Sequence, residues 1–533
     1  MDITDVLVLG GGPCGSAASS MAAKAGFSVT LLEREKFPRH HIGESLLPAS
    51  IPLLEALGAA DEISKAGFLP KFGATMVWGI DKSPWTWRFD ETNSENISSY
   101  QVSRAEFDNI LLNNSRTLGV DVREESQVTD IDLEHDLVTK VNFLDKTGKK
   151  QSIKATFIID ASGQSALLSR RLGNRKWDPN FQNLAAYNYF SGGEKLSSPN
   201  ENNIFIESYQ NGWMWNIPLK DNITSVGTVV DANSWKGHVK DSDSFLSSQI
   251  DSTHYSKEML SHARPMGNTR IVKDWSYRAN NMTGTNWVMA GDAACFIDPL
   301  FSSGVHLALM SGVLASAVAV TTLRNPVMAK PAASEYERIF LEEYSHFREL
   351  ARLFYSSNRT TDSYFWHARR ILGNKDKYDP RSTFIRAVAG QSHLGYERMV
   401  LERGQLPKSF HQGMKDYQNE LTDRESKLTS LGSYITQTIP CLAPGTSVRR
   451  GTVLGDGEFI TGTLLYSESR PDGVPCSTLV DNLIRFINGR HTIKEIAYKV
   501  STNYDVTVRG EVVNNVLRAI HILYNDGIIA ELK

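Results

Sequence analysis

Runs of consecutive apolar residues, rather than alternating ones, mark the N-terminal part of the chain. Val6–Leu9 and Val29–Leu32 are two such runs. Continuous apolar runs predict strands of a parallel sheet, because such a sheet is covered on both faces. Between the two runs, the small residues of Ser16–Ala23 predict a helix. A strand–helix–strand unit therefore opens the chain, and an α/β fold with added α+β elements is expected.

A second pattern, in which apolar and polar residues alternate, occupies two later segments. It is clearest in Asn203–Ser208 and Ser225–Val230. Alternation of period two is typical of antiparallel strands with one buried face. We therefore expect an antiparallel sheet, inserted at about residues 76–99 and 176–275 of a core that spans residues 1–325.

Helical periodicity follows this core. Charged and apolar residues recur at helical spacing in Ser334–Tyr355, which favours a mainly helical region over residues 326–440 that completes the side covered by the antiparallel sheet. The apolar segment Val305–Thr322 predicts a buried core helix rather than a membrane span. Its length is at the lower limit for a bilayer, and it carries His306.

The C-terminal part of the chain differs in texture. Residues 441–474 are expected to form a linker, because glycine, proline and serine are frequent there. Residues 475–533 carry three helical patterns and a closing strand, which resembles a small winged-helix or PqqD-like domain. This segment lacks a dense basic face. Docking of a peptide or carrier protein, or packing against the main body, is therefore favoured over DNA binding.

Composition narrows the function classes. The chain has 533 residues, 41% of them apolar and 22% charged, with a formal net charge of −3. These values are typical of a globular protein and give no electrostatic case for a nucleic-acid partner. The four cysteines are too far apart for a metal site, so we expect no metal and reduced thiols. The N-terminus lacks the pattern of a signal peptide, so a cytoplasmic protein without a membrane partner is expected.

The first apolar run leads into a glycine-rich loop. Gly10, Gly12 and Gly15 follow the spacing G-x-G-x-x-G between a strand and a helix. Glycine is needed there for a tight turn, for close approach of a pyrophosphate and for close helix–strand packing. An acidic residue at the end of the second strand is placed to bind ribose hydroxyls. The motif therefore predicts dinucleotide contacts at Gly10, Gly12, Pro13, Gly15, Ser16 and Glu33.

Three later segments favour FAD as the dinucleotide. Arg104 opens an amphipathic helix, Asp160 and Gly163 follow an apolar strand, and Asp292 follows another strand. Taken singly, Arg104 is compatible with a surface charge and Asp292 with a helix N-cap. In this order they resemble the flavoprotein monooxygenases of the p-hydroxybenzoate hydroxylase type. That resemblance implies that Arg104 approaches the flavin nucleotide and that Asp292 binds the ribityl chain.

Four further segments resemble the flavin-dependent halogenases, from about residue 5 to about residue 400. They are Pro38–Pro48, Trp213–Pro218, Asp298–Gly304 and Thr361–Trp366, and the last is similar to the chondrochloren-halogenase branch, which acts on tyrosine-derived groups. The resemblance implies that Trp213 and Trp215 keep the substrate away from the flavin. An amphipathic strand with one aromatic face is the structural alternative. It also implies cofactor contacts at Arg39, Gly43, Glu44, Ser45, Gly304 and Val305.

The halogenase resemblance implies a specific chemistry. Reduced FAD and O2 form a hydroperoxide, and chloride or bromide attacks it to give hypohalous acid. Lys71, which lies in an apolar neighbourhood, is expected to hold this oxidant by a hydrogen bond or to capture it as a haloamine. Without that context, a surface lysine would be the ordinary interpretation. Ser302 is the second catalytic candidate, and the N–H groups of Ser303 and Gly304 are expected to bind halide.

The identity of residue 301 indicates which class of substrate is expected. Tryptophan halogenases have a glutamate at this place, which stabilises the cationic intermediate on an indole, whereas a phenol stabilises its own intermediate. A phenolic ring, such as a tyrosyl unit of a natural-product precursor, is therefore favoured, with a pyrrole as an alternative. Phe301 is grouped with the two tryptophans as a gating residue. We also expect a separate NAD(P)H flavin reductase and a small aromatic substrate, free or tethered to a carrier protein. A flavin-dependent aromatic hydroxylase or a prenyl-chain reductase is the alternative activity on this fold.

Overall fold

The computed structural model describes residues 2–79, 82–92, 97–210, 212–232, 241–356, 381, 384–385, 388–389, 422–467, 470–502 and 509–533. The chain divides into two compact units. The first comprises Met1–Asn374 and Asp379–Ser392, and the second comprises Lys375–Tyr378 and His393–Lys533. Each unit is described by itself.

A seven-stranded sheet organises the first unit. Its order is β7-β2-β1-β10-β9-β8, and β17 pairs with β10. The central pairs are parallel, whereas β8 and β9 are antiparallel additions. The strands are β1 (Asp2–Leu9), β2 (Val29–Leu32), β7 (Asp121–Arg123), β8 (Gln127–Glu134), β9 (Leu137–Leu144), β10 (Lys150–Asp160) and β17 (Trp287–Met289). The parallel centre agrees with the continuous apolar runs, since Val6–Leu9 are fully buried.

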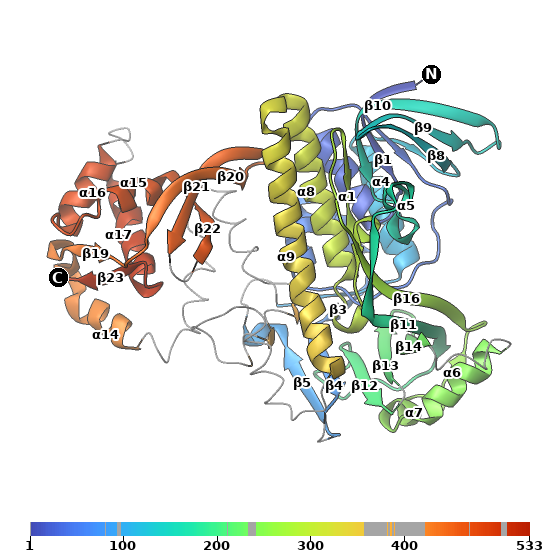
Figure 1. The fold of residues 1–533 in the computed structure, drawn as a ribbon. Coiled ribbons are helices and arrows are strands. Elements are labelled where there is room, and N and C mark those ends of the chain that lie inside the picture. The colour runs from blue at the N-terminus through green and yellow to red at the C-terminus, as the bar shows by residue number, and fades with distance from the viewer. Residues whose placement is uncertain are drawn as a thin grey trace. The chain divides into compact units, whose positions relative to one another are not determined.

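Helices pack closely beside this sheet. In Figure 1, α1 (Pro13–Lys24), α8 (Gly304–Arg324) and α9 (Ala329–Ser356) run side by side. The approach depends on glycine: a Cβ at Gly15 would lie 1.8 Å from the Gly10 carbonyl oxygen, and one at Gly312 would lie 2.4 Å from that of Cys14. Other helices of this unit are α2 (Ser50–Leu57), α3 (Ala60–Lys65), α4 (Arg104–Thr117) and α5 (Leu167–Leu172).

Helix α8 is the one described helix that is long and apolar enough to cross a membrane. Of its most apolar window, 89% is buried inside the protein, as the sequence led us to expect for a core helix. The predicted helical region over residues 326–440 begins with α9. Most of residues 357–421 lie outside the described part of the chain.

A nine-stranded sheet forms the second layer of this unit. Its order is β18-β16-β11-β14-β13-β12-β4-β5, with β15 beside β11. The pairs are antiparallel except for β12 with β4. The strands are β4 (Gly73–Val77), β5 (Pro84–Arg88), β11 (Arg175–Ser191), β12 (Ile204–Tyr209), β13 (Gly212–Leu219), β14 (Ile223–Asp231), β15 (Arg264–Pro265), β16 (Arg270–Ala279) and β18 (Cys295–Phe296). The expected sheet is therefore present with one parallel pair, and β3 (Leu69–Lys71) and β6 (Ser99–Gln101) form a separate small pair.

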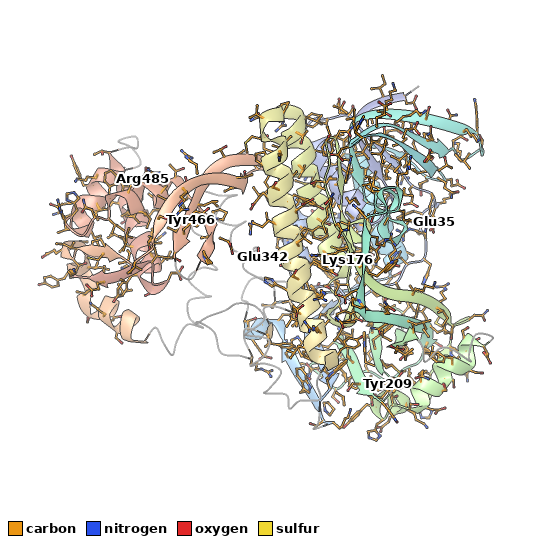
Figure 2. All side chains as sticks on the ribbon, in the orientation of Figure 1. Glu35, Lys176, Tyr209, Glu342, Tyr466 and Arg485 are labelled. Atoms are coloured by element: carbon orange, nitrogen blue, oxygen red, sulfur yellow. The ribbon has the colours of Figure 1, made fainter. Side chains whose placement is uncertain are left out.

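The two faces of the nine-stranded sheet differ. Helices α6 (Ser242–Asp251) and α7 (Tyr255–Met259) cover one face, where Met214 packs with Leu246 and Leu260. Tyr209, labelled in Figure 2, donates a hydrogen bond from its hydroxyl to Gln249 of α6 at 2.9 Å. Trp213 and Trp215 flank Met214 in sequence, so their side chains lie on the opposite face.

The second unit corrects the predicted linker over residues 441–474. Strands β20 (Ser447–Leu454), β21 (Phe459–Ser467) and β22 (Arg470–Cys476) form an antiparallel sheet there. The glycines permit close side-chain packing, since a Cβ at Gly462 would lie 2.3 Å from the Val453 side chain. The other elements are α14 (Thr422–Leu431), β19 (Pro440–Leu442), α15 (Thr478–Phe486), α16 (Ile493–Ser501), α17 (Arg509–Asn525) and β23 (Ile529–Leu532).

Candidate active site

The glycine loop joins β1 to α1 at the end of the parallel sheet. Gly10 has φ of +104°, and a Cβ there would lie 2.5 Å from the Ala161 carbonyl oxygen, so the turn requires glycine. Gly12 is the N-cap residue of α1, and no side chain caps that helix. In the first turn Pro13 has no N–H, and the Ser16 N–H donates to the Gly12 carbonyl oxygen at 2.9 Å. The N–H groups expected to face an anion are therefore those of Cys14 and Gly15.

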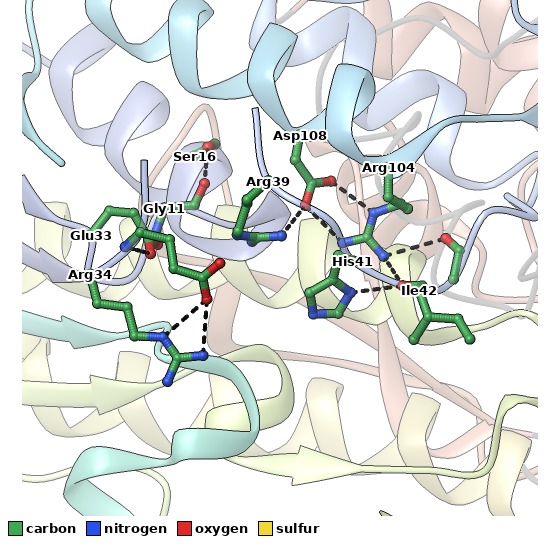
Figure 3. A network of polar contacts seen from close by, with 11 residues as sticks. Gly11, Ser16, Glu33, Arg34, Arg39, His41, Ile42, Arg104 and Asp108 are labelled. Atoms are coloured by element: carbon green, nitrogen blue, oxygen red, sulfur yellow. Dashed lines mark hydrogen bonds and ion pairs between the residues drawn. The ribbon is translucent and has the colours of Figure 1, made fainter. Parts of the chain in front are cut away.

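Glu33 closes the other side of the loop. It follows β2, is buried, and its Oε2 accepts a hydrogen bond from the Gly11 N–H at 2.7 Å (Figure 3). The Ser16 hydroxyl donates to the Gly11 carbonyl at 3.1 Å. These contacts hold an acidic group beside the first turn of α1, as a dinucleotide site requires.

Two arginines share one carboxylate next to this loop. Arg104, at the start of α4, pairs with Asp108 through two hydrogen bonds of 2.8 and 3.0 Å, and Arg39 donates to the same carboxylate at 3.1 Å (Figure 3). Arg104 also donates to the Ile42 carbonyl oxygen at 2.6 Å. The network therefore fixes the segment around Gly43 against α4.

Glu44 is anchored beside this network. It is 2% exposed, and it accepts hydrogen bonds from the Tyr189 hydroxyl at 2.7 Å and the Gly43 N–H at 3.0 Å. Burial raises the pKa of its carboxyl group. Ser45 is buried too, and its hydroxyl has no hydrogen-bond partner among the described residues. Gly43, Glu44 and Ser45 thus line the same edge as Arg104.

The two aspartates differ in their surroundings. Both oxygens of Asp160 are occupied, because they accept hydrogen bonds from the Ser162 and Leu168 N–H groups at 3.0 and 2.7 Å. Asp160 thereby shapes the turn that contains Gly163, whose φ is +61°. Burial raises the pKa of Asp292 to about 7, and the charge of Arg104 opposes that rise.

These features fit FAD. Glycines that tolerate no Cβ, an uncapped helix N-terminus and two arginines beside a carboxylate cluster are what a flavin dinucleotide needs. Asp292 follows the positive-φ Gly291 and keeps its carboxylate near Arg104. The individual cofactor contacts stay predictions.

Lys71 ends the short strand β3 and lies in a cavity. Its side chain is 2% exposed, its Nζ donates to the Leu46 carbonyl oxygen at 3.0 Å, and it lies 5.6 Å from the centre of the Phe89 ring. Burial lowers the pKa of the amine to about 7. The space of this cavity, about 260 Å³ with the adjoining open solvent included, is lined by Leu47, Lys71, Ala74, Trp87, Phe89, Ile204, Ile206, Leu300, Phe301, Ser302 and Val388.

A tight turn carries Phe301 and Ser302 into the wall of this cavity. Ser302 has φ of +57°, and it links a short 3-10 turn to α8. Ser303, the N-cap residue of α8, is buried, and its hydroxyl has no partner among the described residues. Gly304 and Val305 are the first residues of α8, and no side chain caps their N–H groups. The turn therefore presents free donors, as expected for a halide site.

Trp213 and Trp215 pack against each other on β13, with ring centres 5.9 Å apart. They are 2% and 5% exposed, and neither is among the residues that line the Lys71 cavity. The structure thus brings Lys71, Phe301 and Ser302 together in the lining of one cavity, and the two tryptophans are not part of that lining. The Trp213 indole N–H donates to the hydroxyl of Tyr355 on α9.

Three anchoring residues were not predicted from the sequence. Asp108 holds both arginines, and its i,i+4 spacing from Arg104 was the available signal. Tyr189 and Tyr355 act across 145 and 57 residues of sequence, on Glu44 and Asp298, and no local pattern marks them. The predicted motif at Thr361–Trp366 lies outside the described residues.

Comparison with known proteins finds relatives over most of the chain. The family model described as tryptophan halogenase matches residues 5–98 and 88–407. A tryptophan 2-halogenase of Chondromyces crocatus is 32% identical over 439 residues, which cover 80% of this chain and 82% of that protein. A 1H-pyrrole-2-carbonyl peptidyl-carrier protein chlorinase of Pseudomonas fluorescens is 33% identical over 378 residues, covering 66% of this chain and 84% of that protein.

A solved structure agrees with these sequence relatives. The myxobacterial chondrochloren halogenase CndH, described as a variant of FAD-dependent halogenases, superposes with a TM-score of 0.66. It is 38% identical, and the match covers 78% of this chain and 95% of that chain.

Proposed function

The chain belongs to the flavin-dependent halogenases, and from this premise we propose that it chlorinates or brominates a phenolic ring, such as a tyrosyl unit of a natural-product precursor. Membership makes the protein an enzyme that uses FAD and a halide on an aromatic or pyrrole substrate. The choice of a phenol among these rings, and the residues assigned to each step, are our proposal.

The composition of the cavity wall carries the choice of substrate. Among the described lining residues, Lys71 is the one ionisable side chain. The halogenase resemblance puts Phe301 at the place where tryptophan halogenases have a glutamate. The described lining residues therefore include no carboxylate that could stabilise a cationic ring intermediate. A phenol supplies this stabilisation through its own oxygen, and more strongly as a phenolate. The aromatic walls at Trp87 and Phe89 suit a flat aromatic ring.

Lys71 is assigned the transfer of the oxidant. Bound reduced FAD supplies, together with oxygen and halide, hypohalous acid. Because the pKa of Lys71 is lowered to about 7, a large part of the amine is neutral at neutral pH. A neutral amine captures the halogen as a haloamine, with loss of water, and a protonated one holds hypohalous acid by a hydrogen bond. In either form the halogen leaves from a fixed point in the wall of the cavity.

We assign halide binding to the turn at residues 302–304. Backbone N–H groups of Ser303 and Gly304 stand at the N-terminus of a 21-residue helix, where partial positive charge favours an anion. Ser302 lines the cavity and links this turn to Phe301. Halide binding and halogen transfer are therefore assigned to neighbouring residues, and Trp213 and Trp215 are assigned the separation of substrate from flavin.

Partners follow from the same assignment. Reduced FAD must come from a separate NAD(P)H flavin reductase, which halogenases of this family use. The Pseudomonas relative is named for a pyrrole on a carrier protein, which favours a pyrrole as the second substrate candidate and a tethered substrate as a second mode of delivery. The Chondromyces relative is named for tryptophan, so an indole belongs in the same comparison.

The test is turnover by the full chain with a flavin reductase, NADH, FAD and chloride or bromide. Substrates are a tyrosyl phenol, a pyrrole-2-carbonyl compound and free tryptophan, with the first two also offered as carrier thioesters. Mass spectrometry should detect halogenation of the phenol ortho to its hydroxyl. Halogenation of the pyrrole or of tryptophan alone would reject the phenolic assignment.

A further inference from the structure

We propose that Tyr355 is a positioning residue that ties the halide turn to the tryptophan pair and thereby sets the coupling of halide binding to product formation. The inference rests on the proposed halide site at Ser303 and Gly304. It concerns a residue on α9, which approaches that turn from a distant part of the sequence.

The hydroxyl of Tyr355 is the centre of a polar chain. It donates to Oδ2 of Asp298 at 2.7 Å, and it accepts a hydrogen bond from the Trp213 indole N–H. Asn183 of β11 donates to the same carboxylate oxygen at 3.1 Å. One hydroxyl therefore joins β13, α9 and the loop that precedes α8.

Asp298 passes this anchoring on to the halide turn. It is 2% exposed, and its Oδ1 accepts a hydrogen bond from the Leu300 N–H at 3.0 Å, which caps the 3-10 turn Pro299–Phe301. Ser302, Ser303 and α8 follow directly. No cation pairs with the Asp298 carboxylate among the described residues, so its hydrogen-bond donors fix its place. A buried carboxylate that loses a donor shifts toward the remaining ones.

The position of Tyr355 allows the hydroxyl to be tested apart from the fold. The side chain is 36% exposed, although Asp298 and Trp213 are buried. Its ring packs edge-on against Phe181 at 5.6 Å and against Trp78 at 6.3 Å, and phenylalanine preserves both contacts. Tyr355→Phe therefore removes one hydroxyl and leaves the ring.

A matched control is available on the same helix. The hydroxyl of Tyr336 donates to the Met289 carbonyl oxygen at 2.6 Å, beside the parallel sheet. Tyr336→Phe makes the same chemical change at a buried hydrogen bond that does not involve the halide turn.

The experiment measures three quantities for wild type and both variants: the KM for bromide or chloride, the product formed per reduced flavin oxidised, and the dissociation constant of FAD. For Tyr355→Phe we expect the halide KM to rise about tenfold and the product yield to fall, because one hydrogen bond to a charged group is lost. The FAD dissociation constant should stay within twofold. Tyr336→Phe should resemble wild type in the halide KM.

Two outcomes separate the inference from the function it rests on. A wild-type enzyme that halogenates no ring would reject the proposed function. A wild-type enzyme that halogenates, with Tyr355→Phe equal to it in halide KM and yield, would overturn the positioning role. Should Tyr355→Phe fold poorly, Asp298→Asn keeps the shape of the side chain and removes its charge. That variant should raise the halide KM in the same way, and an unchanged value would also overturn the inference.

Discussion

Trp215 lies directly over Gly227, its partner in the register of β13 and β14. A Cβ at Gly227 would lie 2.2 Å from the indole ring and 2.6 Å from the Cβ of Tyr187 on β11. The absence of a side chain at Gly227 therefore leaves the space that the Trp215 indole occupies. Both indole N–H groups are hydrogen-bonded, that of Trp213 to the Tyr355 hydroxyl and that of Trp215 to the Ser225 hydroxyl at 3.3 Å, and Trp215 in addition packs on Gly227.

Gly227→Ala should destabilise the protein by about 1–3 kcal/mol, because the added methyl forces the indole from its place. Displacing Trp215 should also lower the product formed per flavin oxidised. Urea unfolding and product analysis measure the two effects. Gly193→Ala is the control, because its Cβ would meet only side-chain atoms, at 3.1 Å or more. Equal stability of the two variants would show that the Trp215 indole does not pack tightly on Gly227.

Lys71→Ala should abolish halogenation while reduced flavin is still consumed, because the lysine acts after the oxidant forms. Lys220→Ala is the control: Lys220 also lies over an aromatic ring, at 5.4 Å from the centre of Phe68, but outside the cavity. Product formation and NADH oxidation are followed together. Near-normal product from Lys71→Ala would refute its assigned role.

The lowered pKa of Lys71 also makes a stability prediction. Between about pH 7 and 10.5 the folded protein keeps this amine neutral, whereas the unfolded chain binds a proton there. The wild-type unfolding free energy should therefore rise with pH across this window relative to Lys71→Met. The advantage of the methionine variant should be largest below pH 7 and disappear near 10.5. A difference that does not change with pH would mean that the amine titrates normally.

Gly12→Val and Asp292→Ala should each weaken FAD binding. A side chain at Gly12 would occupy the space expected for the pyrophosphate, and Asp292→Ala removes the carboxylate that is expected to bind the ribityl chain. Fluorescence titration of FAD measures both. Thermal unfolding without FAD is the control for Gly12→Val. This change should lower stability little, because a Cβ at Gly12 meets only Arg39, at 3.3 Å. Unchanged affinity in both variants would remove the assignment of the motif.

Short-range patterns predicted much of this structure. The loop from Gly10 to Gly15 and the acidic end of β2 were recognisable because a strand, a turn and a helix follow one another within 33 residues. The linker over 441–474 was predicted wrongly, because closely packed strands that contain several glycines have the same amino-acid composition as a flexible segment. The contact of Tyr355 with Asp298 could not be predicted, since only the folded chain brings them together.

The identity of residue 301 makes a final prediction about the substrate. Phe301 is 6% exposed and packs edge-on against Phe354 at 5.2 Å, so the described residues place two uncharged rings in this part of the wall. A ring that stabilises its own cation should therefore react best, and the phenolate form should react faster than the phenol.

The rate should rise through the pKa of Lys71 near 7 if a haloamine forms, and rise again as the phenol ionises toward its own pKa, near 10 for a tyrosyl group. An electron-poor phenol with a lower pKa should move the second rise to lower pH and leave the first in place. Initial rates of halogenation for two such phenols, from pH 6 to the limit of stability, separate the two ionisations. Fast turnover of free tryptophan with no turnover of either phenol would reject the role of Phe301.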